Sequence, residues 1–199
     1  MGAGPGPDGA RRRTLDRRMQ DWPGRPHVPP YVFLTEALEL CRTISDVEAL
    51  LNTTNRDAGM LLFAVDGKDN GFALFDCMCS KHYRRQPSNG WIVGTNHCCA
   101  CEDLTLSDAD TEPLGTLSRF KQMENLVQTL SASQTPPNLP SDLIQILADD
   151  AIERRDKGLI TVYSNVACPS TGEIWYTFGG YPAASRGDWQ KLEWPWGEP

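Results

Sequence analysis

Two patterns of paired strands constrain the fold of this chain most. Apolar residues fill segments 60–65 and 72–79, and the turn between them holds Asp-Gly and Asn-Gly pairs, which is typical of a β-hairpin. Segments 159–166 and 174–178 flank Pro169-Ser-Thr-Gly172 and predict a second hairpin. Strands joined in this way pair antiparallel, so the sequence predicts an α+β fold.

Helical periodicity indicates four helices around these strands. Their apolar stripes run through residues 31–42, 45–51, 118–129 and 141–155. Ser45 with Glu48 has the spacing of a capping box, and Ser141 is placed to cap the last helix. Residues 82–85 are interpreted as a solvated turn, and residues 179–196 as a loop-rich tail.

Residues 91–96 are predicted to form one more buried strand. The strand ends in three side chains that can form hydrogen bonds, Thr95, Asn96 and His97. Strand ends are where a rigid scaffold presents polar groups to ligands, so these residues are candidates for a binding or catalytic site. The alternative is that they serve only the turn.

Charge divides the chain into a tail and a domain. Residues 1–28 are rich in glycine, proline and arginine, and we expect a disordered basic tail there, with a folded domain over 29–199. The first 26 residues carry a net charge of +3 and the rest −10, which disfavours an electrostatic nucleic-acid surface. No apolar segment is long enough to span a membrane, and export and peroxisomal signals are absent, so we expect a cytoplasmic protein.

The cysteines suggest a different class of function. Cys77 and Cys79 with His82, and His97 with Cys98, Cys99 and Cys101, place soft ligands near one another, as zinc or copper(I) would require. The spacing contains no Cys-x2-Cys pair, so we expect reduced structural thiols and no metal. Without an export signal, disulfides are disfavoured as well.

Three motifs occur in an order that resembles a known family. They are Val93-Gly-Thr-Asn-His-Cys98, Leu117-Ser-Arg-Phe-Lys-Gln-Met-Glu124, and Thr161-Val-Tyr-Ser164 followed by Pro169 and Gly172-Glu-Ile-Trp175. From about residue 29 to 196, the chain resembles the C-terminal part of the penicillin acyltransferase family, which are N-terminal-nucleophile hydrolases. The motifs are specific in combination and not singly.

The resemblance implies a four-layer αββα sandwich, here without its N-terminal strands, and a precursor whose cleavage exposes a nucleophilic cysteine. It places Asn96 at the oxyanion and Lys157 near the family's arginine, with Arg154 or Arg155 as alternatives. It also places Thr95, His97, Gly180 and Tyr181 near the substrate. The implied partners are a small-molecule acyl donor and an amine acceptor. No cofactor is implied, and acyl-CoA would be a substrate.

The chain departs from the family at the nucleophile. None of its seven cysteines follows a glycine, as the family's nucleophile does. We therefore expect an acyltransferase or amidohydrolase acting on amide or thioester donors, in β-lactam- or peptide-type specialised metabolism, that is inactive alone. A late gene start, a truncated gene or a partner chain carrying the nucleophile would explain this. The alternative is a catalytically dead binding or assembly subunit. A Cys/His metal-binding protein is a third and less favoured interpretation.

Overall fold

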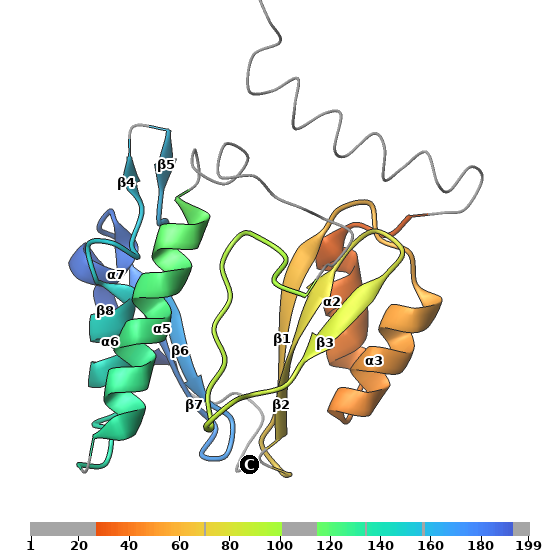
Figure 1. Cartoon of the computed structure of the whole chain (residues 1–199), viewed down its shortest axis with the longest axis horizontal. Coiled ribbons are helices and arrows are strands. Elements are labelled where there is room, and N and C mark those ends of the chain that lie inside the picture. Colours follow the sequence, from red (N-terminus) through yellow and green to blue (C-terminus); the bar gives the residue numbers. More distant parts are fainter. Residues whose placement is uncertain (1–26, 70, 101–114, 134, 157, 193–199) are drawn as a thin grey trace, which may run out of the picture.

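The computed structural model describes residues 27–69, 71–100, 115–133, 135–156 and 158–192. Within these ranges the chain is a mixed α+β structure whose named strands all pair antiparallel. Figure 1 shows two groups of elements beside each other, an N-terminal group in orange and yellow and a C-terminal group in green and blue. The αββα layering stays a prediction.

Two helices begin the N-terminal group. α2 spans Pro30–Leu40, with proline in its first turn, and α3 spans Ile44–Thr53. The periodicity of the sequence predicts that Ala37 and Leu38 share the inner face, but α2 buries Phe33 with Ala37 and leaves Leu38 86% exposed. The helix is rotated in this way because the Phe33 ring removes more apolar surface from water than Leu38 would.

α3 begins with a capping box two residues earlier than the sequence indicates. Thr43 Oγ1 accepts a hydrogen bond from the Asp46 backbone N–H at 3.2 Å, and Asp46 Oδ2 accepts one from the Thr43 N–H at 2.9 Å. The prediction of Ser45 as the cap is therefore wrong. A second donor, the Arg42 N–H, lies 3.0 Å from Asp46 Oδ2, and these donors lower the pKa of Asp46.

Thr43→Ala is expected to lower the free energy of unfolding by about 1 kcal/mol, because a donor at the start of α3 loses its partner. Ser45→Ala is the matched control and should change it by less than about 0.5 kcal/mol, since Ser45 is an exposed residue inside the helix. Urea unfolding followed by circular dichroism measures both. A larger loss for Ser45→Ala than for Thr43→Ala would contradict the assignment.

The first sheet has the order β1-β2-β3, with β1 at Met60–Asp66, β2 at Gly71–Cys77 and β3 at His82–Arg85. The predicted hairpin is confirmed, with Asp66 opposite Gly71. Residues 82–85 form a strand and not a solvated turn. One face of the sheet packs on α2 and α3 to form the core, whose buried members are Phe33, Ala37, Leu51, Leu62, Ala73, Phe75 and Cys77.

The opposite face of this sheet is covered by the segment that the sequence predicts as a strand over 91–96. Only Trp91 forms a bridge, with Ser88, and the residues after it have no regular structure. A Cβ on Gly94 would lie 2.9 Å from Leu74 Cδ2 and 3.2 Å from Phe63 Cζ, so the segment packs on the sheet face. The prediction of burial was correct at Val93 (4% exposed), and the prediction of a strand was wrong.

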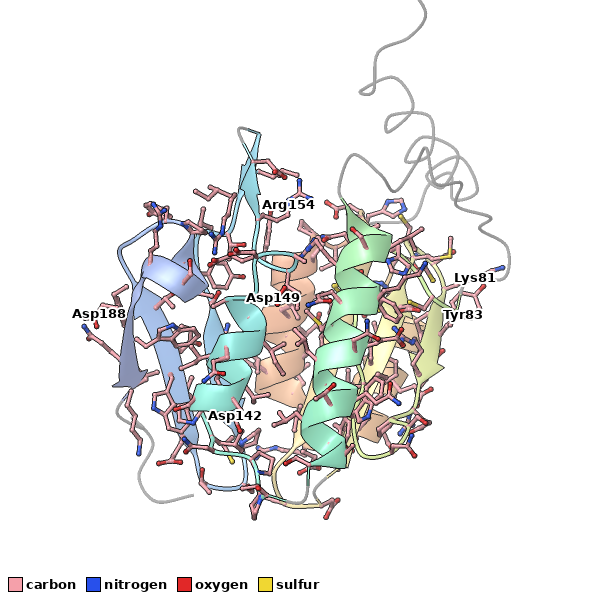
Figure 2. All side chains as sticks on the ribbon, turned by 60° about the vertical axis from the view of Figure 1, so that its left-hand side comes forward. Lys81, Tyr83, Asp142, Asp149, Arg154 and Asp188 are labelled. Atoms are coloured by element: carbon pink, nitrogen blue, oxygen red, sulfur yellow. The ribbon has the colours of Figure 1, made fainter. Side chains whose placement is uncertain are left out.

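The C-terminal group begins with α5 at Thr116–Ala132 and α6 at Ser141–Leu147. α6 is shorter than predicted because residues after Leu147 turn back on themselves, with the Asp149 backbone carbonyl accepting hydrogen bonds from Ile152 and Glu153. Figure 2 shows Asp149 between α6 and α5, where the Gln122 side chain donates to it at 3.1 Å.

Five strands and a short helix complete this group. The bounds are Arg155–Asp156 (β4), Leu159–Ile160 (β5), Asn165–Cys168 (β6), Glu173–Phe178 (β7), Ala183–Arg186 (α7) and Asp188–Leu192 (β8). The second predicted hairpin is confirmed as β6–β7, while residues 159–160 pair separately with β4. β8 lies within the predicted loop-rich tail and adds a third strand beside β7.

The two groups meet at their hairpin turns. A Cβ on Gly67, in the β1–β2 turn, would lie 2.7 Å from the Pro169 carbonyl oxygen in the β6–β7 turn. Near the start of the described residues, the Val28 backbone forms hydrogen bonds with the backbones of Asn55 and Asp57. Val28 was predicted to lie in the tail, but it contacts the N-terminal group. Residues 1–26 of the predicted tail lie outside the described residues.

Candidate functional site

A cavity of about 640 Å³ lies between the first sheet and the segment that crosses its face. It is lined by residues 58–61, 76–78 and 94–98 and by Arg119. Three of the predicted site residues, Thr95, Asn96 and His97, therefore lie together in its wall. They reach it from an irregular segment that packs on the sheet, and not from a strand end.

Thr95 and His97 are held by the start of α5. Thr95 Oγ1 donates to the Thr116 carbonyl oxygen at 2.9 Å, and the Thr116 hydroxyl donates to Thr95 Oγ1 at the same distance. His97 Nδ1 lies 2.9 Å from Thr116 Oγ1 and 3.0 Å from Thr95 Oγ1. Phe120 adds an edge-to-face contact with the His97 ring, at 5.2 Å between centroids. Sequence reasoning missed Thr116, which is 1% exposed.

Arg119 positions Asn96, and it too was missed as a site residue. Its Nη1 donates to Asn96 Oδ1 at 2.9 Å, while its Nε donates to the Ile152 carbonyl oxygen at 3.0 Å. Burial, and then the charge of Arg154, lower the pKa of Arg119. The sequence signal for Arg119 is the Ser-Arg-Phe motif at the start of this helix.

Asp76 holds the end of the segment against the sheet. Its carboxylate is 1% exposed, and Oδ2 accepts hydrogen bonds from the backbone N–H groups of Cys99 and Ala100 at 2.8 and 2.9 Å. Oδ1 lies 3.6 Å from Arg85 Nη1, an ion pair in which Arg85 also faces the Phe120 ring. A buried carboxylate that gathers donors in this way fixes a loop in one conformation.

The cysteines at the cavity do not form a metal centre among the described residues. Burial raises the pKa of Cys77 to about 12, so this thiol stays protonated. Cys98 is disulfide-bonded, which corrects the expectation of reduced thiols at this residue, whereas Cys77, Cys79 and Cys99 are reduced as expected. The absence of an export signal describes a tendency of cell interiors and does not decide the state of a single thiol. Cys101 lies outside the described residues.

Gly180 and Tyr181, two other predicted site residues, do not line this cavity. Lys157 lies outside the described residues, whereas Arg154 pairs with Asp156 and its charge acts on Arg119. Gly180 has φ +66°, and a Cβ there would lie 2.1 Å from the Arg186 carbonyl oxygen, so its lack of a side chain serves a close turn. Tyr181 is 59% exposed.

Comparison of the chain with models of protein families, with curated proteins and with solved structures gives no match. No helix in the described part of the chain combines the length and the apolar character needed to cross a membrane.

Proposed function

We propose that this chain contributes the oxyanion-binding part of an acyltransferase or amide hydrolase of the N-terminal-nucleophile type. The arrangement of Asn96 and Arg119 carries the proposal. An amide can stabilise a negative oxygen only through its N–H groups, and the Arg119 donor at Asn96 Oδ1 assigns the carbonyl end of the amide to arginine. No described residue accepts a hydrogen bond from Nδ2, so both of its N–H groups are left for a ligand in the cavity that Asn96 lines.

In the proposed reaction a thiolate attacks the carbonyl carbon of an amide or thioester, and the carbonyl oxygen gains negative charge. Asn96 Nδ2 donates to that oxygen, and the nearby Arg119 guanidinium favours the same charge. Donors held in place before the reaction need no reorganisation as the charge forms, which makes them effective. The bond from the carbonyl carbon to the donor's nitrogen or sulfur then breaks, and the amine leaves after gaining a proton or the thiol leaves as its thiolate. The resulting acyl-enzyme passes its acyl group to an amine or to water.

The nucleophile in this proposal comes from outside the cavity lining. Cys77 and Cys98 are the cysteines that line the cavity in the described structure. Cys77 is held as a thiol by burial, and Cys98 is in a disulfide. The same observation favours the second candidate, a subunit that binds an acyl compound without turning it over. Finding a nucleophile on a processed N-terminus or on a partner chain would favour the enzyme over the binding subunit.

Asn96→Ala tests the proposal in the protein purified from its native source together with any partner. Hydrolysis of a panel of acyl-coumarin amides and acyl thioesters is expected to fall about 10²- to 10³-fold in kcat, because one oxyanion donor is lost. Asn125→Ala is the matched control, since Asn125 is an exposed residue of α5 that does not line the cavity, and its kcat should not change. KM should change little for both.

Unchanged turnover in Asn96→Ala would contradict the oxyanion role. If the native-source protein turns over no member of the panel but binds one of the acyl compounds, the result favours the binding subunit. Arg119→Lys adds a test of positioning. Lysine keeps the charge but lacks the planar fork that bridges Asn96 and Ile152, so kcat should fall here as well.

A further inference from the structure

The Cys99 thiol, which the proposed function does not use, contacts a histidine. Its Sγ lies 3.3 Å from His97 Nε2, and its side chain is exposed. The backbone that carries the thiol is held in place, because the Cys99 N–H donates to the buried carboxylate of Asp76. The imidazole is fixed as well, by two threonine hydroxyls and by the edge-to-face contact with Phe120.

The proton count around His97 places the ring proton on Nδ1. The Thr95 hydroxyl proton is donated to the Thr116 carbonyl, and the Thr116 hydroxyl proton is donated to Thr95 Oγ1. Both hydroxyl protons are used in this assignment of the network, which gives His97 Nδ1 the donor role toward the threonine oxygens near it. In a neutral imidazole the other nitrogen has a lone pair. Nε2 therefore accepts from the Cys99 S–H group.

Loss of contact with water favours the neutral forms of both partners at pH 7, and nearby charges modify the effect. Burial lowers the pKa of His97 from its usual value of 6.5, an effect that Asp76 opposes and Arg85 reinforces. Partial loss of contact with water raises the pKa of the Cys99 thiol, with Arg85 acting against the shift and Asp76 and Glu124 adding to it. A neutral imidazole facing a neutral thiol can take the proton at the moment when sulfur attacks, which is general-base catalysis.

We propose that Cys99 is an acyl-accepting thiol whose general base is His97, and that its substrate is an acyl thioester. The Cys99 sulfur forms a bond to the acyl carbonyl carbon while its proton passes to His97 Nε2. The bond from that carbon to the donor sulfur then breaks, and the leaving thiolate takes the proton from Nε2. The products are S-acylated Cys99 and a free thiol. The choice of a thioester rests on the proposed function, whereas the thiol–imidazole pair does not.

Cys168 provides an internal control for the role of His97. It is a partly exposed thiol whose pKa is lowered by the Ser170 and Thr171 hydroxyls, and its described contacts include no imidazole. If thiolate content alone decides reactivity, Cys168 should be acylated before Cys99. If the imidazole assists, the order reverses.

The experiment incubates the full chain, without reductant, with S-hexanoyl-N-acetylcysteamine and follows acylation by intact mass and peptide mapping. We expect Cys99 to react at least about tenfold faster than Cys168 in the unmodified chain. His97→Gln should remove this advantage, and Cys99→Ser should leave only the slow reaction. Faster labelling of Cys168 in the unmodified chain would overturn the proposal without any variant, as would an unchanged Cys99 rate in a folded His97→Gln protein.

The outcome is separable from that of the proposed function. Acylation of Cys99 is stoichiometric and is read as a mass change, whereas turnover is read as released product. Labelling of Cys99 in a protein that turns over no acyl compound would refute the function and leave this inference standing. If Cys99 never becomes labelled but turnover is lost in Asn96→Ala, the proposed function is supported and the inference about Cys99 is refuted.

Discussion

Arg56→Met is expected to lower the free energy of unfolding by about 3–5 kcal/mol, because several buried carbonyl groups would lose their donor at once. Arg56 is 0% exposed and lies over the Phe33 ring, 5.8 Å from its centroid. Its guanidinium donates hydrogen bonds of 2.6–3.1 Å to the backbone carbonyl oxygens of Leu51, Thr54, Met78 and Lys81. These carbonyls belong to the end of α3 and to the β2–β3 turn, so one side chain joins the two.

Guanidinium chloride unfolding followed by tryptophan fluorescence measures the loss. The matched control is Arg84→Met, because Arg84 is partly exposed and makes an ion pair with Glu48 at 2.7 Å. Such a pair contributes about 0–1 kcal/mol, so the control should stay within that range. Equal effects of the two substitutions would show that Arg56 does not hold the helix end to the sheet.

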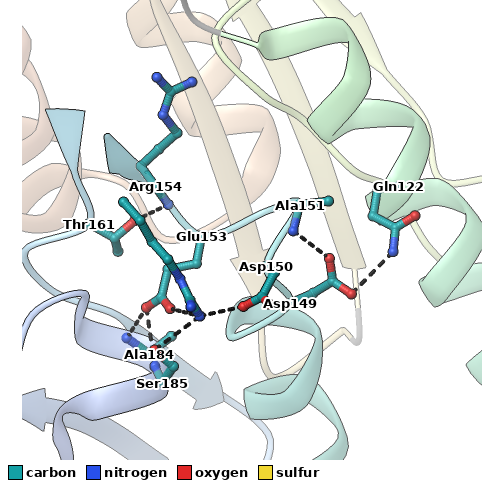
Figure 3. Close-up of polar contacts among 10 residues, drawn as sticks. Gln122, Asp149, Asp150, Ala151, Glu153, Arg154, Thr161, Ala184 and Ser185 are labelled. Atoms are coloured by element: carbon teal, nitrogen blue, oxygen red, sulfur yellow. Dashed lines mark hydrogen bonds and ion pairs between the residues drawn. The ribbon is translucent and has the colours of Figure 1, made fainter. Parts of the chain in front are cut away.

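The second large effect is expected at Glu153. This residue is 4% exposed, and its Oε1 accepts hydrogen bonds from the backbone N–H groups of Ala184 and Ser185 at 2.6 and 3.1 Å. Oε2 lies 3.3 Å from Arg155 Nη2. Figure 3 shows Glu153 reaching from the segment before β4 to these N–H groups at the start of α7. Glu153→Ala leaves these donors without a partner and should destabilise the chain by about 3–5 kcal/mol.

Asp150→Ala is the control for Glu153, since Asp150 contacts the same Arg155 nitrogen at 2.6 Å but has a side chain that is 85% exposed. Its effect should not exceed about 1 kcal/mol. Thermal and denaturant unfolding of both variants give the comparison. A loss below about 1 kcal/mol in Glu153→Ala would mean that α7 is held by its packing and not by the carboxylate.

The elements that could be predicted from sequence are those whose information is local. The β1–β2 and β6–β7 hairpins follow from their turn residues, and both were found. β3 and β8 were missed because His82–Arg85 and Asp188–Leu192 are short and mostly polar, and they become strands by pairing with neighbours already in place. Residues 91–96 have strand-like composition, but packing on a sheet face overrode it.

The same distinction explains the candidate site. Thr95, Asn96 and His97 are consecutive, so one motif was enough to indicate them. Thr116 and Arg119 contact them from a helix that begins about twenty residues later in the chain. No local pattern encodes that approach. The sequence thus indicates the polar groups that face the cavity, and the structure adds the side chains that orient them.

The two hydrogen bonds of Arg119 have a mechanical consequence. One ends on Asn96, which packs with the N-terminal group, and the other on Ile152, in the C-terminal group. Arg119 and Ile152 both belong to the C-terminal group, so if the groups separate, the guanidinium releases Asn96. The freed amide of Asn96 can then rotate about its Cβ–Cγ bond and exchange its oxygen and nitrogen ends. The Asn96 amide is therefore held with its N–H groups toward the cavity only while the N-terminal and C-terminal groups are in contact. A cross-link between the β1–β2 and β6–β7 turns should preserve that orientation under conditions that weaken the contact between the groups. A bulky residue in place of Gly67 should push the two turns apart and abolish it.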